Sequence, residues 1–131
     1  MNKPMLAVVG VLVFAGSLSA HHAYATFYDV QKVVILRGEV SHVSFSGPHA
    51  NLTIETGNSG RWRAEWTNPN RLMDFGITVE TIQVGDFLEI HGSPAFNPDN
   101  PVVSALREIR RRADGWSWTT EAPLPRPRII D

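Results

Sequence analysis

Alternating apolar positions in the first half of the chain predict a long β-strand. Val34, Leu36, Gly38 and Val40 share one face, and the apolar parity then switches to Val43 and Phe45. A change of parity beside Gly38 is typical of a β-bulge that bends a strand. We therefore predict one long, bent strand over Val33–Phe45.

The next two runs predict a β-hairpin. Residues 51–56 alternate between polar and apolar, and Trp62, Ala64 and Trp66 alternate with charged residues. This period of two indicates half-buried strands. The segment Gly57-Asn58-Ser59-Gly60 between them is rich in turn residues. We expect the two tryptophans to pack in the core rather than to form a ligand platform.

A short helix is predicted after the hairpin. Asn68-Pro69 combines a capping residue with proline at the first helical position. The helix then covers 70–75 with Leu72 and Phe75 on its inner side. Gly76 follows at the position where a left-handed residue ends a helix.

Two more strands complete the predicted domain. In Phe87–His91 the apolar and polar side chains alternate, which places Glu89 and His91 together on the face opposite the apolar one. A loop rich in proline and asparagine, 93–101, precedes a last strand over 102–109.

Five strands with a helix between the third and fourth match the order of an oligonucleotide/oligosaccharide-binding (OB) barrel. We predict a mainly all-β domain over 21–115, a small five-stranded OB-like antiparallel barrel with one short helix between strands 3 and 4. An open antiparallel sandwich is the alternative. Residues 116–131 contain Trp116, Trp118 and three prolines. We predict an extended C-terminal tail there, whose first half wraps the domain with aromatic anchors.

The first twenty residues have the character of a signal peptide. One lysine precedes an uncharged apolar run, 5–15, and a small-residue stretch, 16–20, follows it. The apolar run is too short for a helix that crosses about 30 Å of hydrocarbon. We therefore predict a secretory signal peptide over 1–20 and a periplasmic or secreted protein with no membrane attachment after cleavage.

Three cleavage positions fit the small residues near this junction. A cut after Ala20 makes His21-His22 the first two residues of the mature chain. A cut after Ser19 leaves one alanine before them, and a cut after Ala25 discards both histidines. We favour the cut after Ala20, with Ser19 second.

The composition excludes several kinds of chemistry. The chain has 131 residues and no cysteine, which removes disulfides, thiolate metal sites and a cysteine nucleophile. A formal charge of -1 argues against nucleic acid as a partner, because such binding depends on neutralising phosphates. No G-x-S-x-G, P-loop or H-E-x-x-H motif is present. We expect no enzyme, and keep an oxidative copper enzyme as a reserve hypothesis.

Histidine is therefore the strongest soft-metal ligand in this chain. If cleavage follows Ala20, the free α-amine and the imidazole of His21 can chelate one metal ion together. If it follows Ser19, His22 becomes the third residue, in an arrangement that favours square-planar Cu(II) or Ni(II). His49 is the best-placed further ligand from the fold. The alternative is that the histidine pair is simply polar sequence at a frayed terminus.

The remaining histidines and a basic cluster receive structural interpretations. We expect His42 to be partly buried beside the bulge, and His91 to lie on the surface. The cluster Arg107, Arg110, Arg111 and Arg112 is expected to form a solvated sheet edge, paired with Glu108 and Asp114, that discourages strand addition.

Several different short motifs follow one another along the chain in a definite order. The run His21-His22-Ala23-Tyr24 follows the predicted signal peptide. The others are Arg37-Gly38-Glu39-Val40, Pro48-His49, Asn68-Pro69-Asn70-Arg71-Leu72, Gly76-Ile77-Thr78, Val84-Gly85-Asp86 and His91-Gly92-Ser93-Pro94. Together they resemble a family of small exported bacterial proteins, a domain of unknown function (6152), whose members open with His-His-Ser-Phe. The resemblance covers about 21–115.

The resemblance implies export and the fold, and it favours a cut that leaves the histidine pair at the mature terminus. It implies no activity. His91 precedes its glycine, whereas the family's histidine follows it, so the carried-over site residues are His21, His22 and His49. We predict a binding domain whose ligand is a transition metal, copper first, held by these three residues. The alternative is a structural or partner-binding accessory domain of a periplasmic complex, without metal.

Overall fold

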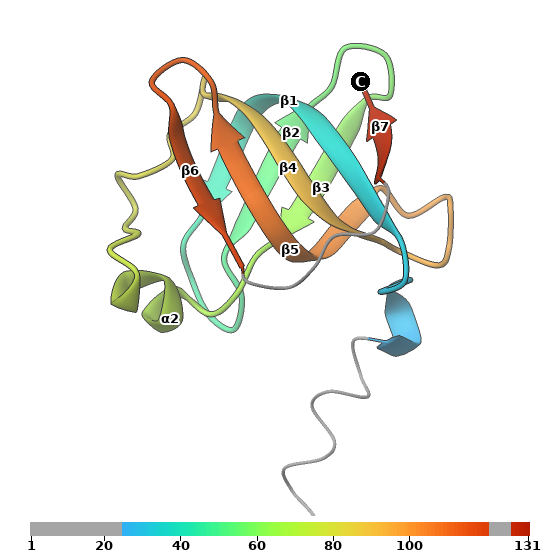
Figure 1. The fold of residues 1–131 in the computed structure, drawn as a ribbon, viewed down its shortest axis with the longest axis horizontal. Coiled ribbons are helices and arrows are strands. Elements are labelled where there is room, and N and C mark those ends of the chain that lie inside the picture. Colours follow the sequence, from blue (N-terminus) through green and yellow to red (C-terminus); the bar gives the residue numbers. More distant parts are fainter. Residues whose placement is uncertain (1–24, 121–126) are drawn as a thin grey trace, which may run out of the picture.

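A computed structural model describes residues 25–120 and 127–131 (Figure 1). The protein is mainly β, with one mixed sheet of seven strands. The strands are β1 (Val33–Ser44), β2 (Asn51–Glu55), β3 (Arg61–Glu65), β4 (Phe87–Pro94), β5 (Val102–Arg111), β6 (Trp116–Thr119) and β7 (Pro127–Ile130). The helix α2 (Pro69–Asp74) lies between β3 and β4, and a helical turn at 25–27 precedes β1. The five predicted strands and the helix are therefore found in the predicted order.

The strand pairings form a circuit. β1 pairs antiparallel with both β2 and β4, and the path leaves β1 for β2 and returns to it through β3, β5 and β4. The predicted sheet was antiparallel, and the observed one is mixed. β3 runs parallel to β5, and β1 runs parallel to β7. The parallel pairs join strands that are not consecutive in the chain. Strand order along the sequence therefore did not reveal them.

The predicted bend in β1 is confirmed. The register of β1 against β2 shifts between Val40 and His42, where the apolar parity changes. Two strands also approach closely at Gly38, because a Cβ atom there would lie 2.3 Å from the carbonyl oxygen of Glu55. The glycine therefore permits one strand to pair with β2 and β4 at once. His42 itself is exposed, so the prediction of a partly buried side chain is wrong.

The core lies inside the circuit of strands. Each of β1 to β5 contributes its apolar face, and Leu36, Ile54, Leu88, Ile90 and Ile109 have no exposed surface. Trp66 is buried and Trp62 packs against the core from a partly buried position. The expectation that both tryptophans belong to the core is confirmed.

The helix begins as predicted and ends with one difference. The Asn68 side chain accepts a hydrogen bond from the backbone N–H of Asn70 at 2.8 Å, and Gly76 has a φ of 74°. Leu72 is fully buried. Phe75, predicted on the inner side, is 60% exposed, because the helix ends at Asp74 and Phe75 is its C-cap residue, outside the helical face that carries Leu72.

The segment that was predicted to open the tail extends the sheet. β6 pairs antiparallel with β5, and its Trp116 and Trp118 are half-buried against the core. The ring of Trp118 meets that of Trp66 edge to face, with centroids 5.1 Å apart. Within the described ranges, no helix is both long and apolar enough to cross a membrane.

Candidate functional site

Of the three predicted metal ligands, the structure describes His49. His21 and His22 lie outside the described residues. His49 is half-buried just before β2, and its carbonyl accepts a hydrogen bond from the Asn51 side chain at 2.8 Å. No group of three His, Cys, Asp or Glu side chains that could hold a metal is present within 25–120 and 127–131.

The segment that follows the histidine pair is fastened to the same hairpin as His49. The Tyr28 hydroxyl donates a hydrogen bond to the Glu65 carboxylate at 2.6 Å. Glu65 faces Asn51 across the β2–β3 pair, two residues from His49. The backbone N–H of Asp29 also donates to the carbonyl of Pro94 at 2.9 Å. Residues 28–29 are therefore held at the end of the sheet where His49 lies.

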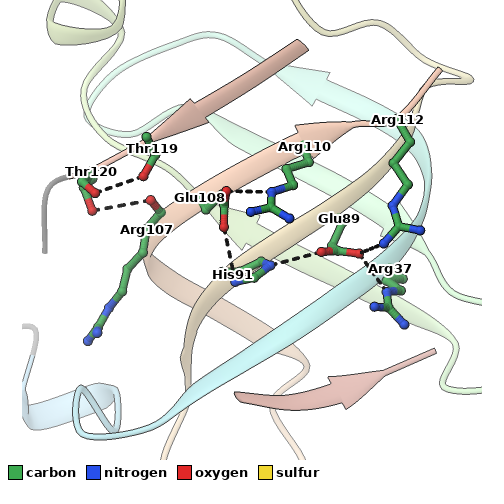
Figure 2. A network of polar contacts seen from close by, with 9 residues as sticks. All are labelled: Arg37, Glu89, His91, Arg107, Glu108, Arg110, Arg112, Thr119 and Thr120. Atoms are coloured by element: carbon green, nitrogen blue, oxygen red, sulfur yellow. Dashed lines mark hydrogen bonds and ion pairs between the residues drawn. The ribbon is translucent and has the colours of Figure 1, made fainter. Parts of the chain in front are cut away.

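A second polar centre is buried between β1, β4 and β5 (Figure 2). Glu89 and His91 are only 6% and 7% exposed, so the prediction of a surface His91 is wrong. The His91 Nε2 atom lies 3.2 Å from Glu89 Oε1, and its Nδ1 atom lies 3.6 Å from Glu108 Oε2. The alternation in β4 placed both residues on one face correctly. Partners of the two residues come from the neighbouring strands, Arg37 from β1 and Glu108 from β5.

Two arginines also donate hydrogen bonds to the Glu89 carboxylate. Arg37 Nε and Arg112 Nη2 donate to Glu89 Oε2 at 3.0 and 2.9 Å, from β1 and from the turn after β5 (Figure 2). Burial raises the pKa of Glu89, but the hydrogen bonds from His91 and Arg37 and the two arginine charges outweigh it. The net pKa is lowered. Glu89 is therefore an ionised structural carboxylate that ties strands together.

Two arginines of the cluster, Arg110 and Arg111, pair with Glu108 and Asp114 as predicted, but the cluster does not lie at an edge. Arg110 contacts Glu108 at 2.6 Å, and Arg111 contacts Asp114 at 2.9 Å and Asp86 at 2.7 Å. These contacts lower the pKa of Asp114 and raise that of Arg111. β5 pairs with β3, β4 and β6, so its cations do not guard a free edge. Pairing by β6 is the reason that this part of the prediction is wrong.

A groove of about 860 Å³ lies between α2, β5 and β6. Its walls are mainly apolar and aromatic. They comprise Ala25, Val30, Trp66, Thr67, Arg71, Phe75, Ala105, Leu106, Trp118, Thr119 and Thr120. The groove was not predicted from the sequence, because its residues come from five separate segments. The pattern Trp116-Ser117-Trp118-Thr119 has the period of a strand and was the signal for one wall.

Fold and surroundings thus define a small, mainly β protein with residues 28–29 held against Glu65 and Pro94, and with an apolar groove between α2, β5 and β6. The chain belongs to a family of unknown function (DUF6152), which matches residues 8–101. The resemblance found from the short motifs is confirmed, and the matched range includes His21, His22 and His49. No curated protein and no solved structure matches the chain.

Proposed function

We propose that this protein is an exported, non-enzymatic binding module that holds a transition metal, copper first, through His21, His22 and His49. The observation that carries the proposal is the anchoring of Tyr28 to Glu65, beside His49. It holds the segment that follows the histidine pair on the hairpin next to His49, and so supports a site shared by the three histidines.

Chain length is compatible with this site. An extended chain covers at most about 3.5 Å per residue, so three residues from Ala25 to His22 reach about 10 Å. Alternation along β2 puts His49 on the same face as Asn51, and Glu65 lies opposite Asn51. The Tyr28 ring is held on that face by its hydroxyl. The proposal is that this anchored segment and the start of β2 supply ligands to the same ion.

The ligand chemistry favours copper. Imidazole and a terminal amine are nitrogen donors, which suit copper, nickel and zinc, and the affinity order of divalent metals peaks at Cu(II). With no thiolate in the chain, these nitrogens are the strongest soft donors present. A fold-derived His49 would distinguish the site from a loose terminal chelate.

We also propose that β1 to β5 form an OB-type barrel. The circuit of pairings from β1 back to β1 supports it, as do the parallel β3–β5 pair and the position of α2 between β3 and β4. OB barrels bind ligands on the strand 2–3 face. That face belongs to the hairpin that carries His49 and Glu65.

The test is a Cu(II) titration of the mature protein, with its first residue verified by mass spectrometry, followed by electron paramagnetic resonance. We expect tighter binding than by a free His-His peptide and a spectrum of mainly nitrogen ligands. His49→Ala should weaken binding and change the spectrum. His42→Ala, which removes an exposed histidine from β1, is the matched control and should change neither.

A single glycine added before the first residue provides a second test, because it displaces the α-amine from the His21 imidazole without touching the fold. We expect the added glycine to weaken Cu(II) binding. Equal binding by the His49→Ala variant and the unmodified protein would remove the site as drawn.

The alternative function, partner binding without metal, is favoured by two exposed aromatic side chains. Phe27 is 65% exposed and Phe96 57%, and the backbone N–H of Phe96 donates to the carbonyl of Phe27 at 3.0 Å. This alternative predicts a periplasmic protein that co-purifies with the wild type and is lost from a Phe27→Ser, Phe96→Ser variant. Retention of the partner by that variant would contradict it.

A further inference from the structure

We infer that the groove between α2, β5 and β6 binds a small amphipathic carboxylate, with its apolar body against Trp118 and its carboxylate at Arg71. This goes beyond the proposed metal site and does not depend on it. At about 860 Å³ the groove falls within the range of small-molecule sites. Its lining combines apolar walls with few polar groups, which is the usual composition of such sites.

The apolar wall is held in place by packing. Trp118 stands edge to face against the buried Trp66, with ring centroids 5.1 Å apart. Leu106 closes the wall from β5, and Phe75 is left 60% exposed where α2 ends. A large aromatic side chain with this exposure, beside a rigid aromatic wall, favours an apolar ligand.

The charge in the groove determines the head group of the ligand. Arg71 is the only charged residue among the lining residues that the structure describes. Its side chain forms no hydrogen bond or ion pair with any residue in 25–120 or 127–131, whereas Arg110, Arg111 and Arg112 are all paired. A guanidinium fork matches a carboxylate in geometry and charge. An unpaired arginine beside an apolar wall therefore favours an amphipathic acid.

The backbone of β5 is distorted at the same place. Ala105 lines the groove and has a φ of 47°, in the left-handed region that residues with a Cβ atom rarely adopt. The register between β4 and β5 shifts opposite this point, between His91 and Ser93. Strain of this kind persists where surrounding structure enforces it, and it is concentrated at ligand sites. Here it bends β5 along the wall of the groove.

The experiment uses metal-free mature protein and two probe acids, 2-naphthoate and decanoate, in calorimetric and tryptophan-fluorescence titrations. The acids distinguish an aromatic ligand from an acyl chain, and binding of either supports the inference. The neutral analogue 2-naphthol measures the contribution of the apolar wall alone. We expect at least one acid to bind more tightly than 2-naphthol and to change the tryptophan fluorescence.

Two variants separate the head group from the wall. Arg71→Gln should weaken binding of the acid about tenfold and leave 2-naphthol unchanged, because one charge-assisted contact is lost. Arg128→Gln removes an exposed arginine outside the groove and should change neither. Phe75→Ser should weaken both ligands. The inference is overturned if neither acid binds, if 2-naphthol binds as tightly as the acids, or if Arg71→Gln binds the acids like the wild type.

The proposal for the groove and the proposal for the metal site can be tested independently. Cu(II) binding by the Arg71→Gln variant should equal that of the wild type, and acid binding by His49→Ala should be unchanged. Loss of acid binding on His49→Ala would mean that the two sites are one, which contradicts the groove as drawn.

Discussion

Replacing Glu89 with glutamine tests the interpretation of the buried polar centre in Figure 2 as a structural ion network. The change keeps the size of the side chain and removes its charge. In the wild type the carboxylate is 6% exposed and accepts hydrogen bonds from Arg37 and Arg112, with His91 3.2 Å away. The variant leaves these three groups without their shared anion.

The magnitude follows from the exposure of each partner. A hydrogen bond to a charged group contributes about 1.5–3 kcal/mol, and the partly buried Arg37 pair falls in this range. Arg112 is 74% exposed, so its pair contributes only about 0.5 kcal/mol. The glutamine oxygen retains part of both contacts. We expect the free energy of unfolding to fall by about 2 kcal/mol near neutral pH, which corresponds to about 1 M in the urea midpoint.

The pH dependence of this difference has a defined sign. The pKa of Glu89 is lowered from 4.5, so its contribution to stability is complete above that pH. It is lost as the pH falls through the lower pKa of the folded state. A protonated Glu89 resembles glutamine, and the difference between wild type and variant should therefore shrink below pH 4.5.

The assay is urea unfolding followed by tryptophan fluorescence at about pH 7 and about pH 3, where the linkage predicts the largest contrast. Glu39→Gln is the matched control, because Glu39 is an exposed carboxylate on β1. We expect it to change the free energy of unfolding by less than about 0.5 kcal/mol. Equal effects of the two variants near pH 7, or a Glu89→Gln difference that persists undiminished at low pH, would refute the reasoning.

Three further variants test the fold. Leu72→Ala removes a fully buried side chain that fixes α2 to the core, and should lower the free energy of unfolding by about 3 kcal/mol in urea titrations; a loss below 1 kcal/mol, by the same principle, would mean that α2 is not fixed this way. Gly38→Ala places a Cβ atom 2.3 Å from the Glu55 carbonyl oxygen and should lower the thermal midpoint, for a cost of about 2 kcal/mol. Gly57→Ala, where the added Cβ atom meets open space, is the control and should leave the thermal midpoint unchanged. Equal thermal midpoints of the Gly38→Ala and Gly57→Ala variants would disprove the close approach of β1 and β2 at Gly38. Asn68→Ala removes the helix cap and should cost about 1 kcal/mol, with serine at the same position restoring most of it.

Local pattern was enough to predict much of the fold. Each strand from β1 to β5 has one apolar face in the core, so alternation located it, and the change of parity located the bulge after Val40. The helix was found from Asn68, Pro69 and Gly76, because caps are local chemistry. β7 was missed, since its parallel pairing with β1 joins residues about a hundred positions apart and depends on no local signal.

The candidate sites show the same division. Glu89 and His91 were placed on one face by alternation, but the arginines that bind Glu89 come from β1 and from the turn after β5, which alternation in β4 does not indicate. The groove combines Arg71 from α2 with Trp118 from β6, which no spacing in the sequence connects. His49 was identified from a short motif, and what the structure adds is the anchored segment at Tyr28 beside it.

The most direct test of the proposed function is mass spectrometry of the N-terminus of the protein recovered after export. We predict a mature chain that begins at His21, with the free amine next to its imidazole. A chain that begins at Ala20 would keep the histidine pair and shift the chelate to His22. A chain that begins at Thr26, after a cut at Ala25, would discard both histidines and contradict the metal site.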